Sequence, residues 1–280
     1  MLRTLSFIAK HPLTRSNPLA GFVRFAEWQI RARLQQEVEV PWIGGSKLIV
    51  TKGMTGATGN IYCGLHEFAD MAFLLHLLRP GDLFLDIGAN VGSYTILASA
   101  VVGAQTIAAE PDPYTMLALR RNIAINQIDN RVTAVESAIG DAPGIINFTS
   151  GLDTMNHIAA GSDRNTREVE VKTLDELTKD KDPVFIKLDV EGFEEGVISG
   201  ASETLSNPSL VAVATENGSE AVIGPLKAAG FTQFFYDPFH RVVTKAPIHA
   251  QSNALFVRNM EFVQRRLRES PAYLVLGVAL

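Results

Sequence analysis

The sequence predicts an α/β Rossmann-like fold, with a mostly parallel sheet, helices on both faces and an N-terminal helical and hairpin extension. Three observations predict it. From residue 82 onward, short apolar segments alternate with segments of helical periodicity. The short segments are apolar almost throughout, as is typical of parallel strands that are covered on both faces. A glycine-rich turn at residues 88–92 follows the first of them.

Residues 1–45 are interpreted as a basic helical extension. Within residues 1–36, six arginines and lysines are balanced by one acidic residue, Glu27. The apolar residues that share one helical stripe are Leu19, Val23, Ala26, Ile30 and Leu34. We expect this stripe to pack on the main domain or on a second copy of the chain, which would make the protein a homo-oligomer. The alternative is a basic amphipathic helix that lies on an anionic membrane.

Residues 46–81 are expected to lead into the core. Residues 47–51 and 60–63 are predicted to form a hairpin around a glycine- and threonine-rich turn. Residues 67–78 have helical spacing, and Arg79-Pro80-Gly81 ends this helix. His66 and His76 lie beside its apolar face and are interpreted as structural.

Residues 82–258 hold the predicted core. Its strands are expected at residues 83–86, 105–110, 132–136, 184–190 and 210–216, with weaker β segments at 145–149 and 168–172. Its helices are expected at residues 93–102, 115–126, 194–205 and 219–229. The segments at 232–236 and 254–257 are expected to form an antiparallel pair at one edge. Residues 259–280 are interpreted as a C-terminal tail.

The composition narrows the functional class. A net charge of −5 argues against a general nucleic-acid binder. The single cysteine, Cys63, is expected to be a buried thiol, which fits a reducing compartment and favours a cytoplasmic protein. The N-terminus lacks the apolar core of a signal peptide, and no stretch is long enough for a transmembrane segment.

Ligands of open α/β sheets bind at the carboxyl ends of the strands, so the residues that follow each strand are the first candidates. The first strand runs into Asp86-Ile-Gly88-Ala-Asn90-Val-Gly92, where glycines allow a tight turn and a close approach to a ligand. The turn departs from the G-x-G-x-x-G pattern that cradles a dinucleotide pyrophosphate. The carboxylate of Asp86 would repel a pyrophosphate but suits the ammonium group of S-adenosylmethionine.

Two further segments complete the predicted cofactor site. Glu110 ends the second strand, 22 residues after Gly88, where a carboxylate can accept hydrogen bonds from both ribose hydroxyls. Ser137 and Ala138 follow the third strand, and their small side chains would allow a flat base to lie against them. A Rossmann sheet with a tight turn and a surface glutamate is the alternative.

The fourth strand carries the predicted catalytic residues, Lys187 and Asp189. Strand alternation places both side chains on one face, and a buried lysine needs a charged partner. Asp189 is expected at the strand tip, where a carboxylate can take the proton of a hydroxyl acceptor or position it. A purely structural ion pair of the two residues is the alternative.

Two weaker hypotheses concern the same edge of the sheet. Asp189, Glu191 and Glu216 could form an oxygen-rich Mg²⁺ site, although no ligand spacing establishes a metal. His157 lies between the two weak β segments and is expected either to cover the pocket and contact the acceptor or to be solvated.

Four motifs, in this order and spacing, resemble those of the FkbM-type S-adenosylmethionine-dependent methyltransferases. They read Pro80-Gly-Asp-Leu-Phe-Leu-Asp-Ile-Gly-Ala-Asn-Val-Gly-Ser-Tyr94, Glu110-Pro-Asp-Pro113, Ala138-Ile-Gly-Asp141 and Ile186-Lys-Leu-Asp-Val-Glu-Gly192. Gly200-Ala201 and Glu216 also fit the resemblance, which spans about residues 60–236.

The resemblance implies a class I methyltransferase fold and cofactor binding at Asp86, Gly88, Asn90, Gly92 and Glu110. It also implies O-methylation of a hydroxyl on a small-molecule or glycan acceptor, such as a sugar, a glycolipid or a secondary metabolite. Two other functions are kept as alternatives: an NAD-dependent oxidoreductase on a similar sheet, and a non-catalytic module that binds a nucleoside.

Overall fold

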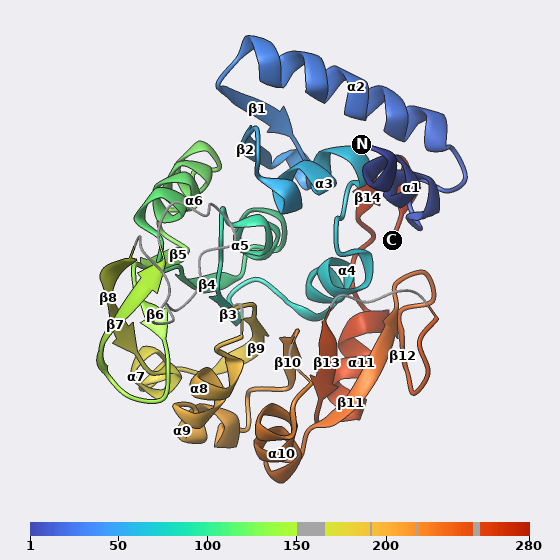
Figure 1. Ribbon diagram of the computed structural model, residues 1–280. Coiled ribbons are helices and arrows are strands. Elements are labelled where there is room, and N and C mark those ends of the chain that lie inside the picture. The colour runs from blue at the N-terminus through green and yellow to red at the C-terminus, as the bar shows by residue number, and fades with distance from the viewer. Residues whose placement is uncertain (150–165, 191, 217, 249–252) are drawn as a thin grey trace.

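A computed structural model describes residues 1–149, 166–190, 192–216, 218–248 and 253–280. Its centre is an eight-stranded sheet in the order β12-β11-β13-β10-β9-β3-β4-β5 (Figure 1). The parallel strands are β3 (Leu83–Ile87), β4 (Gln105–Ala109), β5 (Val132–Val135), β9 (Pro183–Leu188) and β10 (Ala212–Thr215). The antiparallel edge holds β11 (Thr232–Asp237), β12 (Val242–Thr244) and β13 (Ala254–Val257). The predicted fold class and the predicted antiparallel edge pair are confirmed.

Helices cover both faces of this sheet, as the apolar strands require. Leu85 and Ile186 point to one face, where they pack under α8 (Glu194–Ser199), α9 (Ser202–Ser206) and α10 (Glu220–Ala228). Phe84 and Phe185 point to the other face, toward α4 (Phe68–Leu77) and α11 (Met260–Arg268). The remaining core helices are α5 (Ser93–Ile96), which continues as the π-helical turn η2 (Leu97–Val102), α6 (Pro113–Ile125) and α7 (Leu174–Thr178).

A separate three-stranded sheet lies beside the main one. It contains β6 (Ala138–Ile139), β7 (Gly144–Thr149) and β8 (Thr166–Lys172), in the order β6-β8-β7. The two weaker β segments of the sequence are therefore real strands, and they pair with each other in antiparallel fashion. Because β6 directly follows Ser137, this sheet stands next to the predicted adenine-binding residues.

One of the two strands predicted for the hairpin before the core is wrong. Residues 47–51 do form a strand, β2 (Lys47–Thr51), but it pairs with β1 (Glu37–Pro41), while residues 60–63 belong to helix α3 (Thr55–Cys63). Residues 37–41 alternate between exposed and buried side chains, which is the pattern of a half-buried strand. That alternation was the signal in the sequence for the true partner. The short turn η1 (Ile43–Gly45) connects the two strands.

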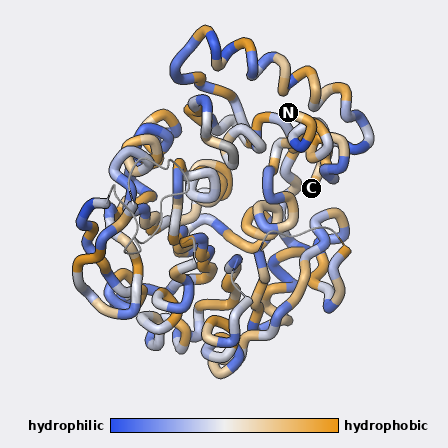
Figure 2. Tube along the Cα trace, in the orientation of Figure 1, coloured by the Kyte–Doolittle hydropathy of each residue, from blue (hydrophilic) through white to orange (hydrophobic). Residues whose placement is uncertain are grey.

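The expected helix of the N-terminal extension exists, but the expectation that its aliphatic stripe packs on the main domain is wrong. Helix α2 (Pro18–Leu34) follows α1 (Leu2–Lys10), and hydrophobic and hydrophilic residues alternate along it (Figure 2). The predicted stripe faces outward, since Leu19 and Ile30 are 71% and 60% exposed, whereas the aromatic Trp28 is 3% exposed. A large aromatic side chain buries more apolar area than the smaller residues of the stripe, so it determines which face packs. Contact of the stripe with a second copy stays a prediction.

The C-terminal residues 259–280 pack into the main domain. Val263 and Leu267 of α11 join the core cluster around α4, and Arg266 forms an ion pair with Asp82. A short hairpin follows, formed by β14 (Leu274–Val275) and β15 (Val278–Ala279). No helix in the described part of the chain has both the length and the apolar character needed to cross a bilayer.

Candidate functional site

The candidate site lies where the strand order reverses. From β3 the chain moves outward to β4 and β5 and then returns to β9 on the other side of β3. The loops that follow β3, β4 and β9 therefore meet at one edge, and such a switch point is the usual ligand site of an open α/β sheet. The predicted site residues that follow these strands are brought together there.

The turn after β3 holds the backbone in conformations that suit the residues found there. Gly88 has a φ of +77°, and a Cβ at this position would lie 1.8 Å from the carbonyl oxygen of Asp189. Asn90 has a φ of 51°, which asparagine tolerates better than most residues. Gly92, with a φ of 92°, precedes the first residue of α5. The turn therefore presses directly against the end of β9.

Glu110 is buried behind this turn and is 7% exposed. Its Oε2 accepts a hydrogen bond from the amide of Asn90, and its Oε1 accepts one from the amide of Asp112, both at 2.9 Å. Burial raises the pKa of this carboxyl to about 7, although the two amides oppose the shift. Each oxygen keeps a further lone pair for a ligand hydroxyl.

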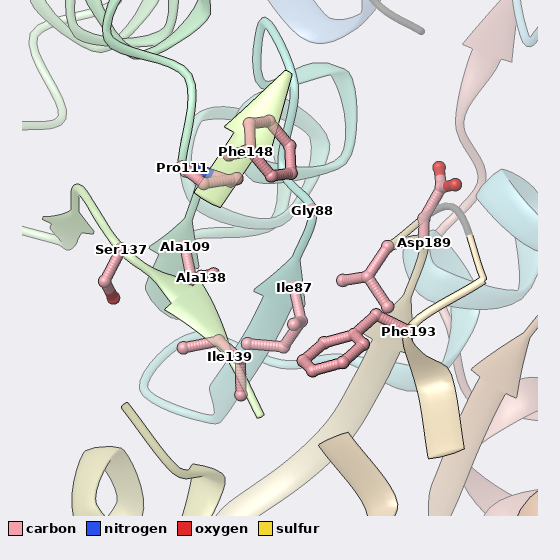
Figure 3. A pocket seen from close by; sticks show the side chains of 11 residues that line it. Ile87, Gly88, Ala109, Pro111, Ser137, Ala138, Ile139, Phe148, Asp189 and Phe193 are labelled. Carbon is pink, nitrogen blue, oxygen red and sulfur yellow. The ribbon is translucent and has the colours of Figure 1, made fainter. Parts of the chain in front are cut away.

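An apolar cavity of about 50 Å³ opens beside Gly88 (Figure 3). Ala138 lines it together with the rings of Phe148 from β7 and Phe193 from the loop after β9. Ser137 is also a lining residue, and its Oγ is buried and has no hydrogen-bond partner in the described part of the chain. Sequence analysis missed both phenylalanines, because the pairing of the small sheet brings Phe148 here and no local spacing signals it.

A second, more polar cleft of about 300 Å³ meets the apolar cavity at Gly88 and Asp189. Its charged and polar lining includes His66, Glu67, Tyr94, Lys187, Asp189 and Glu216. An apolar cavity and a polar cleft therefore share one wall, formed by the glycine turn and the tip of β9.

The predicted pair of Lys187 and Asp189 is present in this cleft. Lys187 Nζ lies 2.6 Å from Asp189 Oδ2, and the two side chains are 3% and 29% exposed. The ammonium also lies 4.7 Å from the centre of the Tyr94 ring. Burial alone would lower the pKa of Lys187, but the carboxylates of Asp189, Glu67 and Asp86 more than offset it, so the pKa is raised and the lysine stays charged.

Asp86 lies deeper than the sequence suggested. It is 1% exposed, it is the in-register neighbour of Lys187 on β9, and its Oδ2 accepts a 2.6 Å hydrogen bond from the Thr95 hydroxyl. Burial raises its pKa, and the charge of Lys187 opposes that shift. The negative charge of Asp86 thus compensates part of the positive charge of the buried Lys187.

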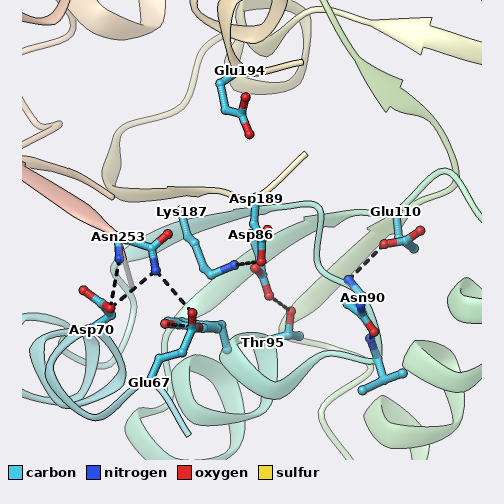
Figure 4. Close-up of polar contacts among 12 residues, drawn as sticks. Glu67, Asp70, Asp86, Asn90, Thr95, Glu110, Lys187, Asp189, Glu194 and Asn253 are labelled. Atoms are coloured by element: carbon cyan, nitrogen blue, oxygen red, sulfur yellow. Dashed lines mark hydrogen bonds and ion pairs between the residues drawn. The ribbon is translucent and has the colours of Figure 1, made fainter. Parts of the chain in front are cut away.

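A polar network that sequence analysis missed joins this cleft to α4 (Figure 4). The Tyr94 hydroxyl donates a 2.7 Å hydrogen bond to Glu67 Oε2. Asn253 Nδ2 lies 3.5 Å from Glu67 Oε1 and 3.4 Å from Asp70 Oδ2. Tyr94 ended a motif quoted above, but nothing in the sequence paired it with residues 27 positions upstream.

His66 also lines the cleft, although the sequence suggested a purely structural role. Its Nδ1 is buried without a hydrogen-bond partner among the described residues, and burial lowers its pKa, which favours the neutral ring. His76 is buried, and its Nδ1 lies 2.5 Å from the Tyr236 hydroxyl, as a structural residue would. Cys63 is a buried free thiol, as expected.

The described residues provide no set of ligands for the hypothesised Mg²⁺ site. His157 and Glu191 lie outside the described residues. Among the residues that are described, no three His, Cys, Asp or Glu side chains group in a way that could hold a metal ion.

Comparison with known proteins places the chain in a family. The model of the methyltransferase FkbM domain matches residues 86–231, more than half of the 280 residues. The chain is similar to 31-O-demethyl-FK506 methyltransferase FkbM of Streptomyces tacrolimicus, with 32% identity over 110 residues, which cover 38% of this chain and 42% of that protein. It is also similar to the hexuronic acid methyltransferase AglP of Haloferax volcanii, with 26% identity over 148 residues, or 52% of this chain and 60% of that protein.

The chain thus matches less than two thirds of the length of either relative. Among solved structures, the precorrin-6y C5,15-methyltransferase of Geobacter metallireducens has a TM-score of 0.39 and 15% identity, covering 69% of this chain and 87% of that one. This likeness is too distant to bear on function. The family match covers the glycine turn, Glu110 and the tip of β9, and the chain therefore belongs to the family of FkbM methyltransferase domains.

Proposed function

We propose that the protein is an S-adenosylmethionine-dependent methyltransferase that methylates a hydroxyl group. The observation that carries the proposal is Glu110: a buried carboxylate, held by two backbone amides beside the glycine turn and close to an apolar cavity. Such a carboxylate suits the two vicinal hydroxyls of a ribose, and an apolar cavity lined by phenylalanine rings suits an adenine ring. Family membership supports the same reading.

The cofactor would be held by the predicted residues in two groups. Glu110 would accept hydrogen bonds from the ribose, and the adenine would lie against Ala138 and Phe148, with the unpartnered Ser137 Oγ as a polar contact. Gly88, Asn90 and Gly92 would shape the turn around the amino-acid end of the cofactor, with Asp86 as a buried negative charge behind it. When bound, the cofactor supplies an activated methyl group on a positively charged sulfur.

Asp189 is the residue that we assign to the acceptor. Lys187 occupies its Oδ2, so Oδ1 remains for a hydrogen bond from the acceptor hydroxyl. Methylation of a hydroxyl requires the loss of its proton, and a carboxylate at this position could accept that proton or direct it to solvent. Lys187 keeps the side chain of Asp189 in place, and the Tyr94–Glu67 hydrogen bond fixes the opposite wall.

The acceptor is proposed to be a sugar, a glycolipid or a secondary metabolite. The polar lining of the cleft supports a hydroxylated molecule. The two relatives act, by their names, on 31-O-demethyl-FK506 and on a hexuronic acid, which supports the same range of acceptors.

The first test is calorimetric titration of the purified chain with S-adenosylmethionine, S-adenosylhomocysteine and NAD. We expect saturable binding of both adenosyl ligands and none of NAD. Binding of NAD alone would replace the proposal by an oxidoreductase. If the adenosyl ligands bind but no hydroxylated acceptor in a screen becomes methylated, the alternative of a non-catalytic nucleoside-binding module gains support.

A further inference from the structure

A third cavity, of about 420 Å³, lies next to the polar cleft and is built by the N-terminal extension together with residues 52–66. Its lining comes from α1, α2, the end of β2 and α3, which gather at one end of the molecule (Figure 1). Most of this segment precedes the residues that match the family model. We call this cavity the N-terminal groove; its aromatic and basic lining residues are Arg3, Phe7, Phe25, Trp28, Lys52 and Tyr62.

His66 is the wall that the groove and the polar cleft share. Its ring packs closely against α3, since a Cβ on Gly59 would be 2.0 Å from Nδ1. Gly56 and Ala57 of the same helix line the cleft, while Thr58 and Gly59 line the groove. A molecule of sufficient length could therefore occupy both cavities at once and pass over His66.

The floor of the groove is aromatic with a few polar groups. Phe25 and Tyr62 meet edge to face at 5.3 Å, and Phe7 lies 5.1 Å from the His66 ring. The Tyr62 hydroxyl is within hydrogen-bonding reach of the side chains of Thr58 and Gln29. Aromatic surfaces with a few placed polar groups are typical of sites for small organic ligands.

The charge of the groove differs from that of the cleft. Arg3 and Lys52 stand at its rim, no carboxylate lines it, and neither cation forms an ion pair with a described residue. The polar cleft, by contrast, carries three carboxylates and one lysine. The two cavities therefore complement different parts of a ligand: an anionic part in the groove and a neutral hydroxyl in the cleft.

We infer that the N-terminal groove is a binding subsite for the acceptor and that the acceptor is an anionic carbohydrate. The carboxylate or phosphate of one sugar unit would lie between Arg3 and Lys52, with the ring over Phe7 and Phe25. The hydroxyl to be methylated, on a neighbouring unit, would reach Asp189. This inference rests on the proposed function.

The test measures binding of a trigalacturonate, of its neutral methyl-esterified form and of maltotriose 1-phosphate to the full chain in the presence of S-adenosylhomocysteine. We expect saturable, salt-sensitive binding of both anionic sugars in the millimolar range or tighter, and much weaker binding of the neutral ester. Preference for the carboxylate or for the phosphate compound identifies the anionic group. Equal binding of the neutral ester, or no binding of either anionic sugar, overturns the inference.

Two double variants test whether the anionic sugars bind in the N-terminal groove. Arg3→Gln with Lys52→Gln should weaken anionic binding roughly tenfold or more. The control pair Lys10→Gln with Arg15→Gln removes two cations from the same extension outside the groove and should change binding less than about threefold. Equal losses in both pairs would mean a non-specific charge effect and would overturn the assignment.

Tyr62→Phe keeps the buried ring and should reduce binding by a few-fold through the lost hydroxyl. Affinity for S-adenosylhomocysteine, measured in parallel, separates the two proposals. If it is intact while the sugars fail, the groove proposal fails alone. If the sugars bind and the cofactor does not, the methyltransferase proposal fails.

Discussion

The two sides of the candidate site are built in different ways. Most of the proposed cofactor side comes from residues at the ends of the strands β3, β4 and β5 or directly after them, within residues 86–138, and Phe148 of β7 is added to it by the small sheet. The proposed acceptor side is assembled from the N-terminal extension, from Glu67 before α4 and from Asn253 before β13, which are far apart in the chain. The first is a consequence of local strand-to-turn geometry, and the second of long-range packing. The cofactor side should therefore be sensitive to single backbone atoms, and the acceptor side to charge and surface.

The largest expected effect is that of Gly88→Ala. The added Cβ would lie 1.8 Å from the carbonyl oxygen of Asp189, so the turn or β9 must move. We expect loss of S-adenosylhomocysteine binding and a fall in the free energy of unfolding of about 3 kcal/mol or more. Calorimetry and urea denaturation measure both.

Gly81→Ala is the matched control for this variant. Gly81 has a φ of +85°, but nothing lies within 4 Å of a Cβ there. Only the backbone strain applies, at about 1 kcal/mol, and cofactor binding should persist. If the two variants behave alike, the close approach of Gly88 to β9 is not what the cofactor side depends on.

Asp189→Asn tests the proposed catalytic role of Asp189, which lies in the wall between the two sides. The amide oxygen can still accept from Lys187, but the side chain can no longer take a proton. With an identified acceptor, we expect kcat to fall about 10²- to 10⁴-fold while affinity for S-adenosylhomocysteine changes less than about threefold. Glu220→Gln, in α10 away from the cleft, serves as the control. Full turnover in Asp189→Asn would remove Asp189 from the chemistry.

The raised pKa of Glu110 predicts that cofactor binding depends on pH. Burial raises its pKa to about 7, so the ionised form that accepts ribose hydroxyls is lost as the pH falls below that value. Affinity for S-adenosylhomocysteine should therefore drop by up to about tenfold per pH unit below pH 7. Glu110→Gln should weaken binding at pH 8 by about 1–3 kcal/mol and abolish this dependence.

Stability of the ligand-free protein should show the opposite trend. A carboxyl with a raised pKa binds its proton more tightly in the folded than in the unfolded state. Its contribution to the free energy of unfolding therefore falls as the pH rises from the ordinary value of 4.5 toward 7. Urea titrations of wild type and Glu110→Gln across this range measure the difference, and parallel curves would contradict the assigned burial.

The smallest expected effect is on the outer face of α2. Ile30 is 60% exposed, so Ile30→Ser should change the free energy of unfolding by less than about 0.5 kcal/mol. Trp28→Ala on the inner face should cost about 3–5 kcal/mol, because the ring is 3% exposed. A large loss in Ile30→Ser that depends on protein concentration would instead mean that the stripe is buried against a second copy.

The sequence by itself determined the sheet, its parallel centre and the places where the proposed cofactor-binding residues follow the strands. Apolar strands and turns are short-range features, and parallel strand ends must meet at one edge. It also predicted the Lys187–Asp189 pair, because a buried lysine needs a partner within reach.

Only the tertiary structure decided what lies opposite those residues. Phe148 reaches the cavity through a separate sheet, β1 rather than residues 60–63 pairs with β2, and α2 packs through Trp28 rather than through its aliphatic stripe. Each of these outcomes depends on a competition between surfaces distant in the chain. The periodicity of a single segment shows that an apolar face exists, but the partner with the larger buried area decides which face is used.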